Sequence, residues 1–268
     1  MYRIKLVLGA VLAAIIAAVL TINIFDLTTP PRDIDALLRP SPSPTGAPTI
    51  PTLWTPIPMD TPTPGALTLL LSDDFSRPGN WPRGGGFGYA SGGYVITPPS
   101  GTSFLAIPLS TIQDKTLTSI SIQVEARPES SQAVEYGVFF WHSTDSQGRE
   151  RFLSFTITPG RGFRLSAYRP ATTGTGARLQ RTDIVPETPV RYVNAGATAN
   201  LLRIEVEPGR FRAFINDFPV LDRTNPDIDA YLDRPGFDGG VGMIALRPAS
   251  GSAGARFIQF DLYDLSRG

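Results

Sequence analysis

Apolar and polar residues alternate with a period of two over many short segments of this chain. The pattern is clear in Ile120–Arg127, Leu153–Thr158 and Leu202–Glu207. A period of two is typical of a β-strand that has one face in the core and one face in water. We therefore predict strands over these three segments, and further strands at Gly93–Thr97, Ser103–Pro108, Val134–His142, Gly162–Tyr168, Arg210–Ile215, Gly240–Leu246 and Arg256–Leu265.

Turn signals separate these segments. Pro159-Gly160 lies between two strands, and Asn216-Asp217 is suited to a tight primed hairpin turn because both residues tolerate positive φ. No window in this part of the chain offers three turns of amphipathic helix. Ten or more antiparallel strands without strand–helix–strand alternation predict an all-β fold, a two-sheet antiparallel jelly-roll sandwich over residues 67–268.

The N-terminal part of the chain has a different pattern. Residues 6–25 are apolar apart from Gly9, Thr21 and Asn23, and Arg3 and Lys5 precede them. About 20 residues of helix match the hydrocarbon thickness of a bilayer. We predict one N-terminal transmembrane helix within residues 1–27. Its flanking charges place the N-terminus in the cytoplasm and the rest of the chain outside, in the cell envelope. The alternative is a cleaved signal peptide, which would make the protein secreted.

Residues 28–66 join the apolar segment to the predicted sandwich. They hold eleven prolines and eight threonines. Proline fixes φ and removes backbone donors, so such a segment stays extended and does not form a packed core. We predict a disordered Pro/Thr/Ser-rich stalk here.

Composition narrows the range of functions. The 268 residues include 24 basic and 24 acidic side chains, no cysteine and a single histidine, His142. The balanced charge argues against nucleic acid as a partner. Disulfides, thiolate metal sites and multi-histidine zinc sites are excluded.

Four sets of motifs resemble the concanavalin A-like lectin/glucanase superfamily, in particular its laminin-G-like and 3-keto-disaccharide-hydrolase-like branch. They are Asp73-Asp74-Phe75-Ser76 with Trp81, the pair 135–140 and 151–157 continued by 162–165, the stretches 200–206 and 214–220, and the closing segments 239–244 and 257–261. The resemblance implies a jelly roll whose concave sheet often carries a glycan site, in a module held outside the membrane on a stalk. The residues of these motifs form turns and the hydrophobic core, so they indicate the fold more strongly than the function.

No catalytic residue can be assigned from the sequence. Glycoside hydrolysis needs two carboxylates across the scissile bond, and the Glu-x-Asp-x-Glu type motif of the superfamily's glucanases is absent. His142 and Ser143 adjoin Asp145, but neighbours at a strand end point apart and do not form a triad. The glycine run Gly84–Gly88 lacks the Lys-Ser/Thr of a phosphate-binding loop, and we expect a flexible loop there.

The candidate binding face lies on the predicted strand Val134–His142. Alternation places Tyr136, Phe140 and His142 on one face, and both faces carry large apolar groups. One face packs in the core, and aromatic side chains on the other would stack on a sugar ring. Neighbouring strands add Arg151, Arg164 and Tyr168 to this candidate site. The alternative is a central strand buried on both faces.

Calcium is the one cofactor for which the sequence offers ligands. Asp73 or Asp74 near the start of the domain and Asp261 near its end would meet where the first and last strands pair, and Ca²⁺ prefers such oxygen ligands. A second acidic segment, 222–238, lacks the spacing of an EF-hand.

We expect a membrane-anchored, non-catalytic module that binds a carbohydrate or another envelope ligand. The alternatives are an adhesive protein-interaction module and a glycoside or sugar-modifying hydrolase.

Overall fold

The computed structural model describes residues 67–100, 102–109, 119–130, 134–144, 149–171, 179–207, 209–224, 240–247 and 253–265. All of them belong to one compact unit, Thr61–Gly268. The described residues form β-strands and no helix. The strands are β1 (Thr68–Asp73), β2 (Phe87–Ala90), β3 (Gly93–Ile96), β4 (Phe104–Pro108), β5 (Ile120–Pro128), β6 (Glu135–Thr144), β7 (Glu150–Thr158), β8 (Gly162–Pro170), β9 (Leu179–Pro189), β10 (Asn200–Glu207), β11 (Arg210–Ile215), β12 (Phe218–Arg223), β13 (Gly240–Leu246) and β14 (Ala255–Asp264).

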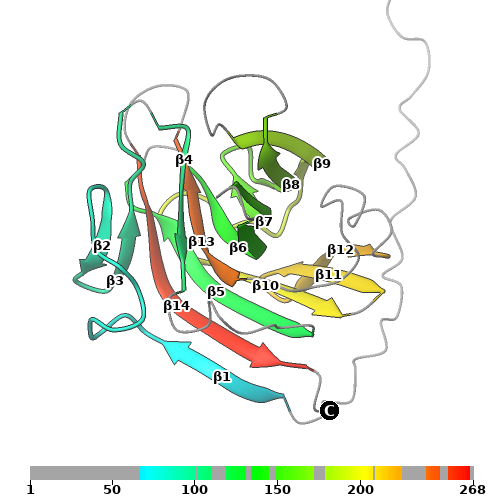
Figure 1. Ribbon diagram of the computed structural model, residues 1–268, viewed down its shortest axis with the longest axis horizontal. Helices are drawn as coiled ribbons and strands as arrows, with labels where there is room; N and C mark the ends of the chain where they lie inside the picture. Colours follow the sequence, from blue (N-terminus) through cyan, green and yellow to red (C-terminus); the bar gives the residue numbers. More distant parts are fainter. Residues whose placement is uncertain are drawn as a thin grey trace, which may run out of the picture. The chain divides into compact units, whose positions relative to one another are not determined.

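These strands form two antiparallel sheets, which confirms the predicted all-β sandwich (Figure 1). The eight-stranded sheet has the order β12-β11-β10-β5-β14-β3-β2, with β1 beside β14. The six-stranded sheet has the order β4-β13-β6-β7-β8-β9. Strands far apart in sequence are therefore neighbours, and the first and last described strands pair with each other.

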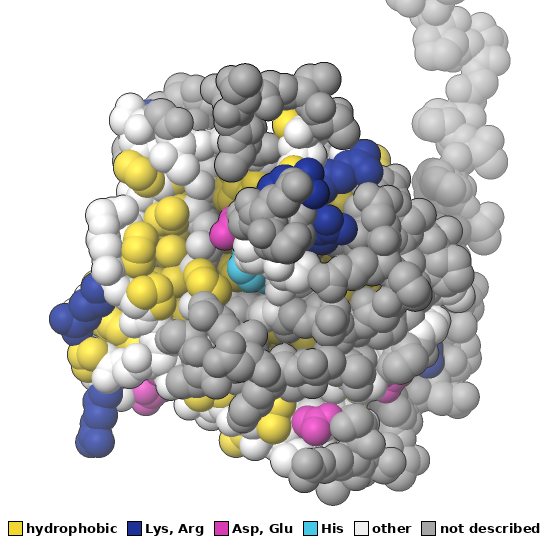
Figure 2. Space-filling view, in the orientation of Figure 1, with side chains coloured by type: hydrophobic (Ala, Val, Ile, Leu, Met, Phe, Trp, Pro, Cys, Tyr) yellow, Lys and Arg dark blue, Asp and Glu magenta, His cyan; other side chains and the backbone are white. Residues whose placement is uncertain are grey.

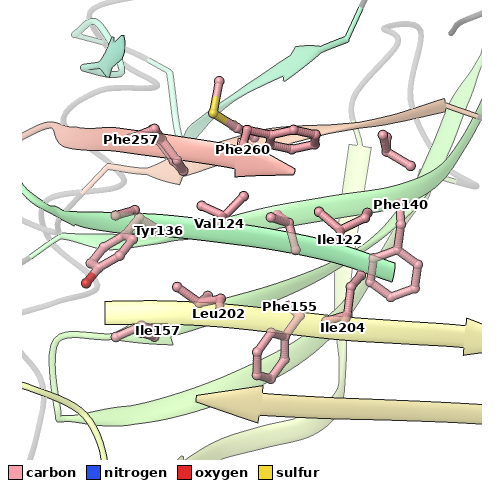
Figure 3. Close-up of a cluster of buried hydrophobic side chains, with 14 of the residues drawn as sticks. Ile122, Val124, Tyr136, Phe140, Phe155, Ile157, Leu202, Ile204, Phe257 and Phe260 are labelled. Atoms are coloured by element: carbon pink, nitrogen blue, oxygen red, sulfur yellow. The ribbon is translucent and has the colours of Figure 1, made fainter. Parts of the chain in front are cut away.

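The main core lies between the two sheets, because alternate residues of each strand point toward the opposite sheet. Ile122 and Val124 on β5 lie in the same buried cluster as Tyr136 and Phe140 on β6 (Figure 3). Figure 3 also shows Phe155, Ile157, Leu202, Ile204, Phe257 and Phe260 in this cluster. The alternation that predicted these strands thus also identified their inward faces.

Ten of the observed strands coincide with predicted ones, and the segments 210–215 and 240–246 match residue for residue. Four observed strands, β1, β2, β9 and β12, were not predicted from the sequence. The expected glycine loop was wrong in part, since Phe87 and Gly88 belong to β2. All four missed strands lie at or near a sheet edge, where many side chains face water and the alternation is weak.

Both predicted turns are present. Asn216 and Asp217 have φ of 50° and 66° and connect β11 to β12, as a primed hairpin turn requires. Pro159 and Gly160 connect β7 to β8.

The predicted transmembrane helix and stalk, residues 1–66, lie outside the described residues. Within the part of the chain that the structure describes, no helix has the length and apolar character needed to span a bilayer.

Candidate functional site

The outer face of the six-stranded sheet, which points away from the main core, carries a second apolar cluster. Its buried members come from β6, β7, β8 and β13, and partly buried residues of β4 and β9 pack against them. We call it the outer aromatic cluster: Phe139, Phe152, Tyr168, Ile244 and Leu246, with Phe104, Ala106 and Leu179. The rings of Phe152 and Tyr168 are stacked, with centroids 4.5 Å apart, and Phe139 lies 5.2 Å from Phe152. The face is therefore largely filled by its own side chains.

A glycine on β13 makes room for this cluster. A Cβ atom built on Gly242 would lie 2.5 Å from two ring atoms of Phe139 and 2.2 Å from the carbonyl oxygen of Ile107. Because such distances are far below van der Waals contact, only glycine lets the Phe139 ring lie against β13.

A bulge in β6 changes which residues share this face. The β6–β7 register shifts between Phe140 and Ser143, and Trp141 has φ of 55°. As a result Phe140 and Trp141 both lie in the main core, while His142 lies beside the outer aromatic cluster, its ring centroid 5.7 Å from that of Phe139. The expectation that His142 shares a face with Tyr136 and Phe140 was wrong, since it assumed an unbroken strand.

A charged network borders the outer aromatic cluster. Glu135 is 9% exposed and accepts hydrogen bonds from Thr156 at 2.8 Å and from Arg164 at 2.6 Å. The Arg164 guanidinium also faces Asp183 at 3.4 Å and Glu187 at 3.2 Å. One cation thus faces three carboxylates from two strands. Figure 2 shows basic side chains gathered beside apolar ones in the region of β8 and β9.

Arg181 and Ser166 complete this network around Asp183. Arg181 Nε donates to Asp183 Oδ1 at 2.7 Å, and the Ser166 hydroxyl donates to the same oxygen at 2.8 Å. Burial acts to raise the pKa of Asp183, but these hydrogen bonds outweigh it and hold the pKa below its ordinary value. Asp183 is therefore an ionised acceptor at neutral pH.

A pocket of about 360 Å³ opens where the cluster meets the network. Phe104, Tyr168, Leu179 and Leu246 form its apolar wall, and the remaining lining residues are Ser103, Glu135, Pro159, Arg181 and Arg247. Glu135 offers a carboxylate acceptor, and Arg181 Nη1 lies 3.7 Å from Glu135 Oε2. Burial raises the pKa of the Tyr168 hydroxyl to about 12, so Tyr168 stays neutral. The pocket combines an apolar wall with charged groups already fixed in position, an arrangement typical of small-molecule sites.

The structure brings together only some of the predicted binding residues. Arg164 and Tyr168 lie on the outer face, and Tyr168 lines the pocket. His142 lies beside the outer aromatic cluster, 3.7 Å from Glu150, and is not among the residues that line the pocket. Arg151 is half-buried on β7 opposite Ser143.

Tyr136 and Phe140 lie in the core between the sheets, 2% and 0% exposed. Asn200 donates a hydrogen bond to the Tyr136 hydroxyl at 3.1 Å. All residues from Glu135 to Trp141 are buried, so the alternative of a strand covered on both faces describes β6 better than an open aromatic face.

Sequence reasoning missed several residues of the pocket. Glu135 was a lone acid at the start of an apolar segment, and it alternates with Gly137 and Phe139 on the face opposite Tyr136. This alternation was the one sequence feature that could have placed Glu135 on the outer face of the sheet. Phe104 and Arg181 come from edge strands at opposite sides of the sheet, and no local pattern predicts that they meet.

The structure does not bring the predicted calcium ligands together. In the β1–β14 pairing Ser72 lies opposite Asp261 and Asp73 lies opposite Phe260, so the side chains of Asp73 and Asp261 point to opposite faces of the sheet. Asp73 instead accepts hydrogen bonds from the Phe75 amide and the Trp81 indole.

The other carboxylates have local partners. Asp74 accepts a hydrogen bond from the Ser76 amide, and Asp261 accepts hydrogen bonds from the Ser72 hydroxyl and the Gln259 amide. In the described ranges no group of three His, Asp or Glu side chains is arranged to hold a metal ion. Asp222 pairs with Arg210, and most of the second acidic segment, 225–238, lies outside these ranges.

The fold and the site define a two-sheet antiparallel β-sandwich with a small mixed pocket on the outer face of one sheet. Three solved structures are similar to this chain. One, described by the words "Prominent members of the human gut microbiota express endo-acting O-glycanases to initiate mucin breakdown", has a TM-score of 0.50 and 10% identity, over 74% of this chain and 100% of that chain. A Bacillus subtilis protein of unknown function with a galectin-like fold has a TM-score of 0.49 and 12% identity, over 74% and 96%. A Bacillus licheniformis β-glucanase has a TM-score of 0.47 and 9% identity, over 73% and 97%.

The first of these structures supports the fold alone. At such low identity they carry no residue roles over to this chain. No protein-family model matches the sequence, and no curated protein is similar to it.

Proposed function

We propose that this protein is a non-catalytic carbohydrate-binding module, anchored in a membrane by its N-terminal segment and exposed outside the cytoplasm. The observation that supports the binding role is the pocket between the outer aromatic cluster and the Glu135 network. A sugar presents an apolar ring face and a rim of hydroxyls, which suit an aromatic wall beside fixed charged groups.

The charged groups of this face favour binding over hydrolysis. Glu135, Asp183 and Glu187 all lie within 4 Å of Arg164. A glycosidase needs one carboxyl that stays protonated to act as a general acid. The pKa of Asp183 is lowered, which is opposite to that requirement. Hydrolysis therefore remains the less favoured candidate.

An adhesive role is the other candidate, and one observation favours it. Leu67, Leu69 and Leu70 at the start of the domain are 46%, 52% and 38% exposed. Apolar side chains gathered on an exposed edge strand are typical of protein-interaction surfaces. In that case Leu69→Ser, and not a pocket variant, would abolish association with other envelope proteins.

Binding of the purified protein to a glycan array, followed by calorimetric titration of each positive glycan, tests the proposed role. Glu135→Gln keeps the shape of the side chain and removes its charge, and Arg181→Gln removes a cation from the pocket wall. We expect either change to weaken binding at least about tenfold, because charged hydrogen bonds contribute about 1.5–3 kcal/mol. Arg210→Gln is the matched control, since Arg210 forms an exposed pair with Asp222 on the other sheet. Glycan binding that both pocket variants leave unchanged would refute the assignment.

The anchor is tested separately. We expect the protein to sediment with membranes, to resist extraction by high salt and to be released by detergent. Added protease should digest the sandwich domain in cells whose outer barrier is opened while the cytoplasmic membrane stays intact. A soluble protein that begins after residue 25 would instead support the cleaved signal peptide.

A further inference from the structure

The six-stranded sheet is strongly curled. In a flat sheet, strands four positions apart lie about 19 Å apart, and β4 and β8 are separated in this way. The ring of Phe104 on β4 nevertheless lies 4.9 Å from the ring of Tyr168 on β8 and 6.0 Å from that of Phe152 on β7. The edges of the sheet must curve toward each other, so the outer face is concave and Phe104 spans it.

This contact divides the concave face into two parts. On one side is the pocket, whose lining includes Phe104 and Tyr168. On the other side are Phe139, Phe152 and His142, which are packed against one another. Phe139 and Phe152 are each 1% exposed. The second part is filled with side chains and offers no continuation for a ligand that lies in the pocket.

A polysaccharide that binds through its internal units needs a groove that is open at both ends. Here the pocket is closed on one side by the contact between Phe104 and Tyr168. Its volume of about 360 Å³ lies near the lower end of the range for ligand pockets, roughly 300–1,000 Å³. The pocket therefore has room for a chain end and not for a chain that passes through it.

We infer that the pocket binds the terminal sugar unit of a glycan chain, and that Phe104 determines this specificity by closing the concave face. The inference rests on the proposed carbohydrate-binding role. A terminal unit carries a free hydroxyl that an internal unit has lost to the next glycosidic bond. Because Glu135 and Arg181 fix an acceptor and a donor in the pocket, a unit without that hydroxyl loses a charged hydrogen bond to one of them.

The test compares chain ends with internal units. The probes are neutral gluco-, galacto- and manno-oligosaccharides of two to four units, the same oligosaccharides methylated on the terminal ring, and the corresponding long polymers at equal mass of sugar. For each sugar that binds, we expect methylation to weaken binding at least about tenfold. The long polymer should bind in proportion to its few chain ends. Equal binding of free, methylated and polymeric forms would overturn the inference while leaving the proposed function intact.

Two variants test the role of Phe104. Phe104→Ala opens the concave face, and we expect it to bind methylated and polymeric forms nearly as well as free oligosaccharides. Phe104→Leu keeps an apolar side chain on β4 but removes the ring contact with Tyr168. It should therefore also weaken the preference for free oligosaccharides over methylated and polymeric forms. This variant tests the role of Phe104 if the alanine variant does not fold. Phe218→Ala is the control, since Phe218 is an exposed aromatic residue of the other sheet.

The outcomes separate the two proposals. Discrimination against methylated and polymeric forms that is lost in the Phe104 variants and kept in Phe218→Ala supports the inference. Discrimination that the Phe104 variants retain contradicts the role of Phe104. If no form of the protein binds any probe, the carbohydrate-binding role itself fails, and the inference fails with it.

Discussion

Replacing Arg164 by methionine removes the cation that holds three carboxylates together on the outer face. Arg164 lies 2.6 Å from Glu135, and both side chains are largely buried, 15% and 11% exposed. Removing one partner of a buried ion pair costs about 3–5 kcal/mol, because the other charge stays buried without its partner. Thr156 and Arg181 remain near Glu135 and reduce this loss. We expect Arg164→Met to lower the free energy of unfolding by about 2–4 kcal/mol at pH 7.

Arg210→Met is the matched control. Arg210 and Asp222 form a pair of similar length, 2.9 Å, but the two side chains are 47% and 43% exposed. Solvent-exposed pairs contribute about 0–1 kcal/mol, so this variant should lose little stability. Urea unfolding followed by tryptophan fluorescence measures both variants, because Trp81 and Trp141 lie in the core and report on its opening.

The loss in Arg164→Met should depend on pH in one direction. Burial acts to raise the pKa of Asp183, but hydrogen bonds from Arg181 and Ser166 and the charges of Arg181 and Arg164 outweigh it and hold the pKa in the folded protein below its ordinary value of 3.8. Its contribution to stability is therefore present above about pH 4 and is lost as the pH falls through the folded-state pKa. The difference between wild type and variant should be largest at neutral pH and should shrink toward pH 3.

Two results would refute this reasoning. One is a loss in Arg164→Met no larger than in Arg210→Met, which would mean that the network is solvated. The other is a difference that stays constant from pH 7 to pH 3, which would mean that lost packing and not charge explains the effect.

Three further predictions concern the fold. Asp217→Gly should raise stability by about 0.5–1 kcal/mol in thermal unfolding because of its positive φ, whereas Asn216→Gly should lower it, since the Asn216 side chain holds two backbone groups. Asp73→Ala should lower stability by about 2 kcal/mol equally in calcium and in chelator, because its carboxylate satisfies buried donors; a loss seen only in calcium would indicate a metal site. Gly242→Ala should lower stability by about 1–3 kcal/mol because it displaces the Phe139 ring, and unchanged stability would show that the sheet relaxes freely there.

The central strands could be predicted because each has one face in the core. In β5 and β10, Ile122, Val124, Leu202 and Ile204 alternate with polar residues, and the structure places all four in the main core. Edge strands give a weaker signal. In β9 most residues are partly or fully exposed. Its Arg181 and Asp183 belong to a charged network that forms only in the folded sheet.

The candidate site could be predicted only in part, for two physical reasons. The bulge at Trp141 exchanges the faces of the residues that follow it, and no local signal predicts positive φ at a tryptophan. The meeting of Phe104 with Tyr168 depends on the curl of a sheet whose strands come from distant parts of the chain. Arg164 and Tyr168 could be placed because they alternate with the core residues of β8.

The most direct test of the carbohydrate-binding role is to locate a bound oligosaccharide by NMR. Titration of the isotope-labelled protein with a glycan identified on the array should shift the arginine Nε–H signals of Arg181 and Arg247, which line the pocket. The signals of Arg203 and Arg210 on the eight-stranded sheet should stay unchanged. Shifts confined to the eight-stranded sheet, or no shift at saturating glycan, would contradict the account.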